Sequence, residues 1–153
     1  MHRNDLLENA NKINNFSQLT HQEYFQKSEL LINNMNSLMM ERKDLEKLIG
    51  KDNERMMKDN HANHVRFIAS ILKNYNPEVL LDTVLWVFRA YRSHGFSTNY
   101  WATQLNSWMI ILKEALSPES YAEVYPLYEW MQINIPLFVK LSDEKLDNTN
   151  SLH

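Results

Sequence analysis

The scarcity of glycine and proline constrains the fold of this chain more than any other feature of its sequence. The 153 residues include only two glycines and four prolines. Strands joined by tight turns use these residues repeatedly, because they adopt the backbone angles that such turns require. The chain is therefore predicted to be all-α, an antiparallel helical bundle of four main helices with an N-terminal helical extension.

Apolar residues recur with a helical period of 3.6 residues along most of the chain. The periodicity predicts helices over residues 3–14, 20–40, 41–50, 52–75, 77–94, 98–116 and 118–140. We divide the chain accordingly into an N-terminal helical extension, a helical bundle and a polar C-terminal tail, with bounds of 1–45, 46–141 and 142–153. A polar terminal segment of this kind is normally loose.

Local signals mark where several of these helices begin. Thr20 and Glu23 have the spacing of a capping box, which predicts the start of the second helix. Asn76 precedes Pro77, which is typical of an N-cap followed by the first helical residue. Two further prolines fall inside the last expected helix, so we expect a kink at one or both of them, Pro126 and Pro136.

The composition excludes several classes of protein. There is no cysteine, so disulfides, thiolate metal sites and a cysteine nucleophile are absent. The net charge of −3 argues against a duplex-binding protein, which needs a dense basic face. No stretch approaches the roughly 20 apolar residues of a membrane span, and the first residues lack the apolar run of a signal peptide. We expect a cytoplasmic protein that binds neither nucleic acid nor a membrane.

Asn60 and His64 lie four residues apart, on one face of the helix expected over 52–75. Two interpretations are open. His64 could contact a ligand while the Asn60 amide orients its ring, or it could be a histidine at the edge of the core that is bonded to a neighbouring side chain. We prefer the second interpretation, because a metal site in a bundle normally uses Glu-x-x-His pairs, which this chain lacks.

Aromatic residues are dense in the second half of the chain, which contains all four tryptophans. Such side chains could line a pocket for a flat ligand, or they could simply fill the core of a bundle. If there is a pocket, the residues expected to form it are Asn60, His64, Phe67, Trp86, Tyr91 and Trp108.

Motifs of enzyme active sites are missing. The sequence has no glycine-rich phosphate loop, no Gly-x-Ser-x-Gly and no pair of carboxylates on an apolar stripe. We therefore expect a protein that is not an enzyme, with neither a catalytic residue nor a metal ligand.

Three segments carry a resemblance to a known family: "IGKDNERMMKDNHANHVRFIASIL", "NPEVLLDTVLWVFRAYRSHGFS" and "WMIILKEAL". They resemble a helical sensor or cap-like module of bacterial signalling proteins, similar to the helical domain that accompanies cobalamin-binding domains. The family pattern is matched by Asn60, His64, Phe67 and Trp86, although the family usually has an acidic residue where Asn60 stands. The chain has no Asp-x-His-x-x-Gly to supply a cobalt ligand and no room for a Rossmann domain.

The resemblance implies a regulatory or sensor module, so our leading hypothesis is a non-enzymatic bacterial module that acts through protein–protein contacts, with a homodimer as the default partner. Five methionines in the N-terminal half would suit an adaptable contact surface. The alternative hypothesis is a tetrapyrrole- or cobalamin-type small-molecule binder with a pocket near His64 and Trp86. An exposed pocket beside His64 would favour this alternative.

Overall fold

A computed structural model describes the backbone of residues 3–13 and 15–151, and the side chains as far as Glu144. Within those residues the chain is all-α, with nine helices and no strand. The helices are α1 (Arg3–Asn11), α2 (Gln18–Gln26), α3 (Ser28–Met40), α4 (Leu45–Ile49), α5 (Glu54–Lys73), α6 (Pro77–Arg92), α7 (Thr98–Ala115), α8 (Pro118–Ile133) and α9 (Ile135–Ser151).

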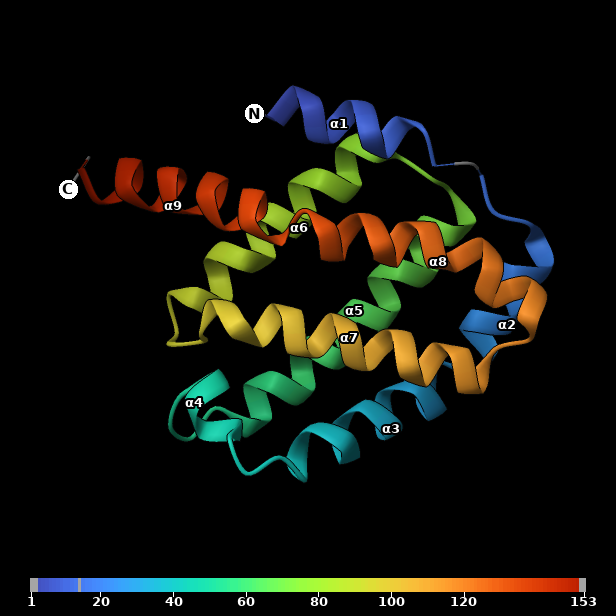
Figure 1. Cartoon of the computed structure of the whole chain (residues 1–153), viewed down its shortest axis with the longest axis horizontal. Helices are drawn as coiled ribbons and strands as arrows, with labels where there is room; N and C mark the ends of the chain where they lie inside the picture. Colours follow the sequence, from blue (N-terminus) through green and yellow to red (C-terminus); the bar gives the residue numbers. More distant parts are fainter. Residues whose placement is uncertain (1–2, 14, 152–153) are drawn as a thin grey trace.

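The helices form one bundle around a shared core. In Figure 1, α7 and α8 run side by side in opposite directions, α5 passes behind α7, and α6 crosses near the start of α9, against which it packs. The N-terminal helices lie on the same bundle: α1 packs against α6 and α8, α2 against α5 and α8, and α3 against α5 and α7. None of the described helices is both long and apolar enough to span a bilayer.

The helix expected over residues 20–40 is two helices, α2 and α3, which meet at Lys27. The hydroxyl of Ser28 donates to the backbone oxygen of Phe25 over 2.7 Å. Serine competes with the helical backbone for hydrogen bonds in this way, and such bonds favour helix ends over helix interiors. The periodic pattern continues across the break, and for that reason it predicted a single helix.

The helix expected over 118–140 is also divided, immediately before Pro136. α8 passes through Pro126 without ending, and Asn134 then separates α8 from α9. The side chain of Asn134 donates to the backbone oxygen of Trp130 over 2.8 Å, which satisfies a carbonyl left free at the end of α8. Pro136 is the second residue of α9, where a missing backbone donor is tolerated.

Residues 142–151, expected to form a loose tail, continue α9 as far as Ser151, while residues 152–153 lie outside the described part. Side chains at the start of this segment are held by the bundle. Ser142 is fully buried, and Arg92 of α6 forms an ion pair with Asp143. The segment therefore has tertiary contacts that its polar composition does not reveal.

α2 and α8 cap each other. The N-cap of α2 is Ser17, whose backbone N–H donates to Glu123 of α8 over 2.7 Å. The N-cap of α8 is Ser117, whose backbone N–H donates to Glu23 of α2 over 2.5 Å. Hydroxyl groups complete each set, from Ser17 and Thr20 to Glu123 and from Ser117 and Ser120 to Glu23. We call these two sets the reciprocal caps.

The capping box expected at Thr20 and Glu23 is not formed, because both residues belong to the reciprocal caps. Thr20 lies in the first turn of α2 instead of at its N-cap, and Glu23 bonds to another helix. Burial alone would raise the pKa of Glu23, but the backbone N–H of Ser117 and the hydroxyls of Ser120 and Ser117 outweigh it and lower the pKa. The pKa of Glu123 is likewise lowered, chiefly by the backbone N–H of Ser17.

The two glycines of the chain meet at one end of the bundle. Gly50 follows α4 with a φ of 88°, and Gly95 follows α6 with a φ of 98°. A Cβ atom on Gly50 would lie 3.3 Å from the backbone oxygen of Gly95 and 3.1 Å from the amide nitrogen of Asn53. Asn53 joins the two loops by donating to the backbone oxygens of Ile49 (2.7 Å) and His94 (2.9 Å).

Candidate functional site

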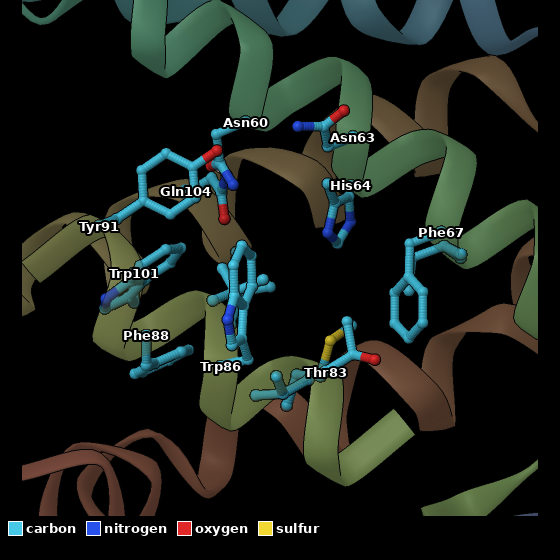
Figure 2. Close-up of a pocket in the computed structure, with 15 residues that line it drawn as sticks. Asn60, Asn63, His64, Phe67, Thr83, Trp86, Phe88, Tyr91, Trp101 and Gln104 are labelled. Carbon is cyan, nitrogen blue, oxygen red and sulfur yellow. Dashed lines mark hydrogen bonds between the residues drawn. The ribbon is translucent and has the colours of Figure 1, made fainter. Parts of the chain in front are cut away.

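A cavity of about 230 Å³ lies between α5 and α6, and α7 and α8 close it on the inner side. α5 and α6 follow one another in sequence, yet they are not among the helix pairs in close contact, because α6 packs mainly against α9 and α1. Figure 2 shows the side chains of α5 and α6 facing each other across the cavity. The separation of two consecutive helices thus creates the site.

Five of the six residues expected to form a pocket line this cavity: Asn60, His64, Phe67, Trp86 and Tyr91. The sixth, Trp108, lies one layer behind. Its ring stacks on that of His64, with centroids 5.0 Å apart and planes inclined by 19°. Trp108 therefore supports the histidine without lining the cavity.

Ten further residues line the cavity and were not expected from the sequence: Asn63, Ile68, Thr83, Val84, Val87, Phe88, Trp101, Gln104, Leu105 and Met131. Gln104 had a detectable signal. It lies on the apolar stripe of α7, between Trp101 and Trp108, and a polar residue in such a stripe is usually there to satisfy a buried partner. Seven of the others carry no such signal, because aliphatic, aromatic and methionine side chains are equally expected in a core, and Asn63 and Thr83 are polar residues of a kind that is ordinary on a helix surface.

His64 joins the cavity to a buried chain of hydroxyl groups. Its Nε2 atom lies 2.7 Å from the hydroxyl oxygen of Tyr128, which lies 2.8 Å from that of Tyr24. This chain crosses from α5 through α8 to α2. Burial, with a smaller contribution from His61, lowers the pKa of His64 to about 3, so the ring is neutral at neutral pH. The preferred interpretation of His64, as a core-edge histidine with a side-chain partner, and the ligand interpretation are thus compatible.

A second set of buried hydrogen bonds orients Asn60. The hydroxyl of Tyr100 and the amide nitrogen of Gln104 both donate to Asn60 Oδ1, over 2.8 and 2.5 Å. Asn60 and Gln104 are 4% and 2% exposed, so water does not compete with these bonds. His61 extends the set, with Nδ1 2.7 Å from Asn36 Oδ1, and burial lowers its pKa to about 3. We call Asn60, Tyr100 and Gln104 the amide cluster.

The cavity opens to solvent between α5 and α6. Trp86 is 59% exposed although its ring forms part of the wall, and Asn63 is exposed on the opposite helix. Tyr91 borders the same opening. Burial raises the pKa of Tyr91, while hydrogen bonding with Asn63 and Asn60 opposes the rise. The cavity lined by Asn60 and Gln104 is therefore open to solvent on the side of Trp86 and Asn63.

The chemistry of the lining is neutral. Among the described residues that line the cavity there is no aspartate, glutamate, lysine or arginine. The described part of the chain contains no group of three or more side chains that could hold a metal ion. The arrangement suits binding of a neutral ligand by ring contacts and hydrogen bonds.

Comparison with protein-family models, with curated proteins and with solved structures finds no match for this chain.

Proposed function

We propose that this protein is a non-enzymatic regulatory or sensor module that binds a small molecule in the cavity between α5 and α6. The observation that carries the proposal is the cavity itself, an open space lined by both aromatic rings and oriented amides. Sites for small molecules typically combine a mostly apolar wall with a few placed polar groups. In this proposal α5 to α8 are the four-helix bundle and the N-terminal helices are its extension.

The hydroxyl chain supports the regulatory part of the proposal. A ligand that contacts His64 would touch the first member of a chain that ends at Tyr24 on α2. Tyr24 is fully buried between helices, so its position depends on how α2 lies on α8. Because His64 is neutral and has a pKa of about 3, it is a poor general base at neutral pH, which favours binding over catalysis.

The volume of the cavity limits the size of the ligand, and this bears on the alternative hypothesis of a tetrapyrrole or cobalamin ligand. Sites for drug-sized ligands enclose about 300–1,000 Å³, and an apolar cavity of about 150 Å³ holds one benzene ring. The observed 230 Å³ therefore suits a ligand of one or two rings. A cobalamin-type ligand stays a prediction that this volume does not favour.

The surface of α2 and α3 supports the proposed protein contacts. Leu19 and Phe25 on α2 are 72% and 62% exposed, and Leu30 on α3 is 49% exposed. Exposed large apolar side chains can contribute to association with a partner. We propose a homodimer or another protein partner, and sedimentation velocity over a range of protein concentrations tests the homodimer.

Nuclear magnetic resonance of the tryptophan indole groups tests the binding site. The chain has four tryptophans, so four indole N–H signals are expected. Titration with quinoline, a neutral two-ring probe, should shift the signals of Trp86 and Trp101, which line the cavity, more than that of Trp130. Thr83→Trp, which fills the cavity, should abolish the shifts.

Thr98→Trp is the matched control for this experiment, because Thr98 lies at the start of α7, outside the cavity. This variant should bind quinoline like the unmodified protein. If quinoline at about 1 mM shifts no signal, or if Thr83→Trp binds it unchanged, the proposed site is wrong.

A further inference from the structure

We infer that the ligand is a neutral, planar heterocycle of one or two rings that carries a hydrogen-bond donor and an acceptor side by side on one edge, as a lactam does. This inference rests on the proposed function, because it names the class of molecule that the same cavity would take.

Charge sets the first limit on the ligand. No carboxylate, ammonium or guanidinium group lines the cavity among the described residues, and His64 stays neutral. Burying an ionised group without an opposite charge is strongly unfavourable. An anionic or cationic ligand would therefore bind much less tightly than a neutral one of the same shape.

The walls set the second limit. Figure 2 shows His64, Phe67, Thr83 and Trp86 around the open space, with three of the four presenting rings. Aromatic side chains favour stacked or edge-to-face contacts with other rings. A flat ring system would make such contacts with Trp86 and Phe67 at once.

The amide cluster sets the third limit on the ligand, because its internal hydrogen bonds leave one donor and one acceptor unused. Asn60 Oδ1 already accepts two hydrogen bonds, from Tyr100 and Gln104, and the Asn60 amide also hydrogen-bonds with Tyr91, so the Asn60 side chain offers the cavity one remaining N–H of Nδ2. Gln104 uses Nε2 in two bonds, to Asn60 and Tyr100, so it offers Oε1 as an acceptor. Oε1 makes no hydrogen bond within the described part of the chain, although Gln104 is only 2% exposed.

The two side-chain amides lie together at one side of the cavity, with Gln104 Nε2 2.5 Å from Asn60 Oδ1. Figure 2 shows the ends of Asn60 and Gln104 next to each other, across the space from Phe67. An N–H group of a ligand would donate to Gln104 Oε1, and an adjacent carbonyl oxygen would accept from Asn60 Nδ2. A lactam edge provides this pair, since its N–H and C=O are neighbours and both are neutral.

Isothermal titration with three probes of matched shape tests the inference. The probes are 2-quinolone, a neutral lactam; quinoline, which has the same two rings and an acceptor but no donor; and 2-naphthoate, which is anionic. We expect 2-quinolone to bind at least tenfold more tightly than quinoline, and quinoline more tightly than 2-naphthoate. This comparison uses the unmodified protein and does not depend on the stability of a variant.

Two variants test which residue causes the preference for 2-quinolone. Gln104→Leu should reduce the affinity for 2-quinolone to about that for quinoline and leave quinoline binding unchanged, whereas Phe67→Ala should weaken both probes equally. If quinoline or 2-naphthoate binds as tightly as 2-quinolone, the inferred class of ligand is wrong and the proposed function stands. If no probe binds, the cavity is not a binding site and both proposals fail.

Discussion

Two polar clusters in this molecule use hydrogen bonds for opposite purposes. The reciprocal caps are charged and fully used: Glu23 and Glu123 each accept from one backbone N–H and two hydroxyls at the start of the other helix. The amide cluster is neutral and partly unused, because its internal bonds leave a donor on Asn60 and an acceptor on Gln104 beside a cavity. The first arrangement stabilises two helices and the second leaves groups available to a ligand.

Titration should most strongly separate the reciprocal caps from His61 and His64, the two histidines beside the amide cluster. The pKa values of His61 and His64 fall from 6.5 in the unfolded chain to about 3 in the fold. Between these values the unfolded chain binds more protons, so the free energy of unfolding falls as the pH falls from 6.5 towards 3. The limiting slope is about 1.4 kcal/mol per pH unit for each histidine, and because the unfolded histidines are already partly protonated at pH 6, the pair should lose about 2.4 kcal/mol between pH 6 and 5.

The reciprocal caps respond in a lower range. The pKa values of Glu23 and Glu123 are lowered from 4.5, so their contribution is complete above 4.5 and is lost as the pH falls below it. Urea unfolding at a series of pH values measures the free energy of unfolding in both pH ranges. His64→Gln should halve the slope between pH 6 and 5, and below pH 4.5 it should remove only the histidine part of the slope and leave the part due to Glu23 and Glu123; a flat free energy between pH 6 and 5 would contradict the assignment.

Removal of a cap carboxylate should have the next largest effect. Glu23→Ala leaves the Ser117 N–H and two hydroxyls without their acceptor, and we expect a loss of about 2–3 kcal/mol in the free energy of unfolding. Glu23→Gln retains one acceptor oxygen and should lose less. Glu114→Ala, at an exposed position in α7, is the control and should change stability by less than about 0.5 kcal/mol.

Substitutions in the hydroxyl chain from His64 through Tyr128 to Tyr24 should reduce the free energy of unfolding by an intermediate amount. Tyr128→Phe removes the hydroxyl that contacts both His64 and Tyr24, and we expect a loss of about 1–2 kcal/mol by chemical denaturation. Tyr24→Phe removes only the end of the chain and should cost less. Because the two tyrosines share one bond, the double variant should lose less than the sum of the single losses; additive losses would show that the hydroxyls act independently.

The smallest effect on stability is expected at the mouth of the cavity. Trp86 is 59% exposed, so Trp86→Ala should change the free energy of unfolding by less than about 0.5 kcal/mol. The same substitution removes a wall of the cavity and should weaken quinoline binding clearly. Val79→Ala, also exposed on α6 but outside the cavity, is the matched control and should bind quinoline normally.

The helices were predictable wherever the signal was local. The bounds expected for α5, α6 and α7 differ by no more than two residues from those observed, and Asn76 caps α6 by accepting from the N–H groups of Glu78 and Val79, as predicted. The break at Lys27 was missed because the apolar period continues across it, and the hydroxyl bonds of Ser28 to the backbone oxygens of Tyr24 and Phe25 leave no mark on that period. Glu23 was assigned to its own helix because its actual partner, Ser117, lies 94 residues away in sequence.

The candidate site was predictable in part for the same reason. Asn60 and His64 stood out as polar residues on a helix face that becomes apolar. The cavity itself depends on how far α5 and α6 separate, which results from the packing of α6 on α9 and α1. Spacing within one helix carries no information about that distance, so the aliphatic walls could not be distinguished from ordinary core residues.

The paired glycine loops have a consequence for the rate of ligand exchange. α5 and α6 are joined covalently by residues 74–76 at one end, and Asn53 and the Ser97 N–H, which donates to Leu48 over 2.7 Å, tie their other ends together. Because α5 and α6 are held together at both ends, the distance between their middle parts stays constant. The entrance of the cavity therefore does not depend on a movement of either helix. Passage then depends on rotation of exposed side chains such as Trp86, which takes place in picoseconds to nanoseconds. Entry of the proposed ligand would then not be limited by movement of a helix.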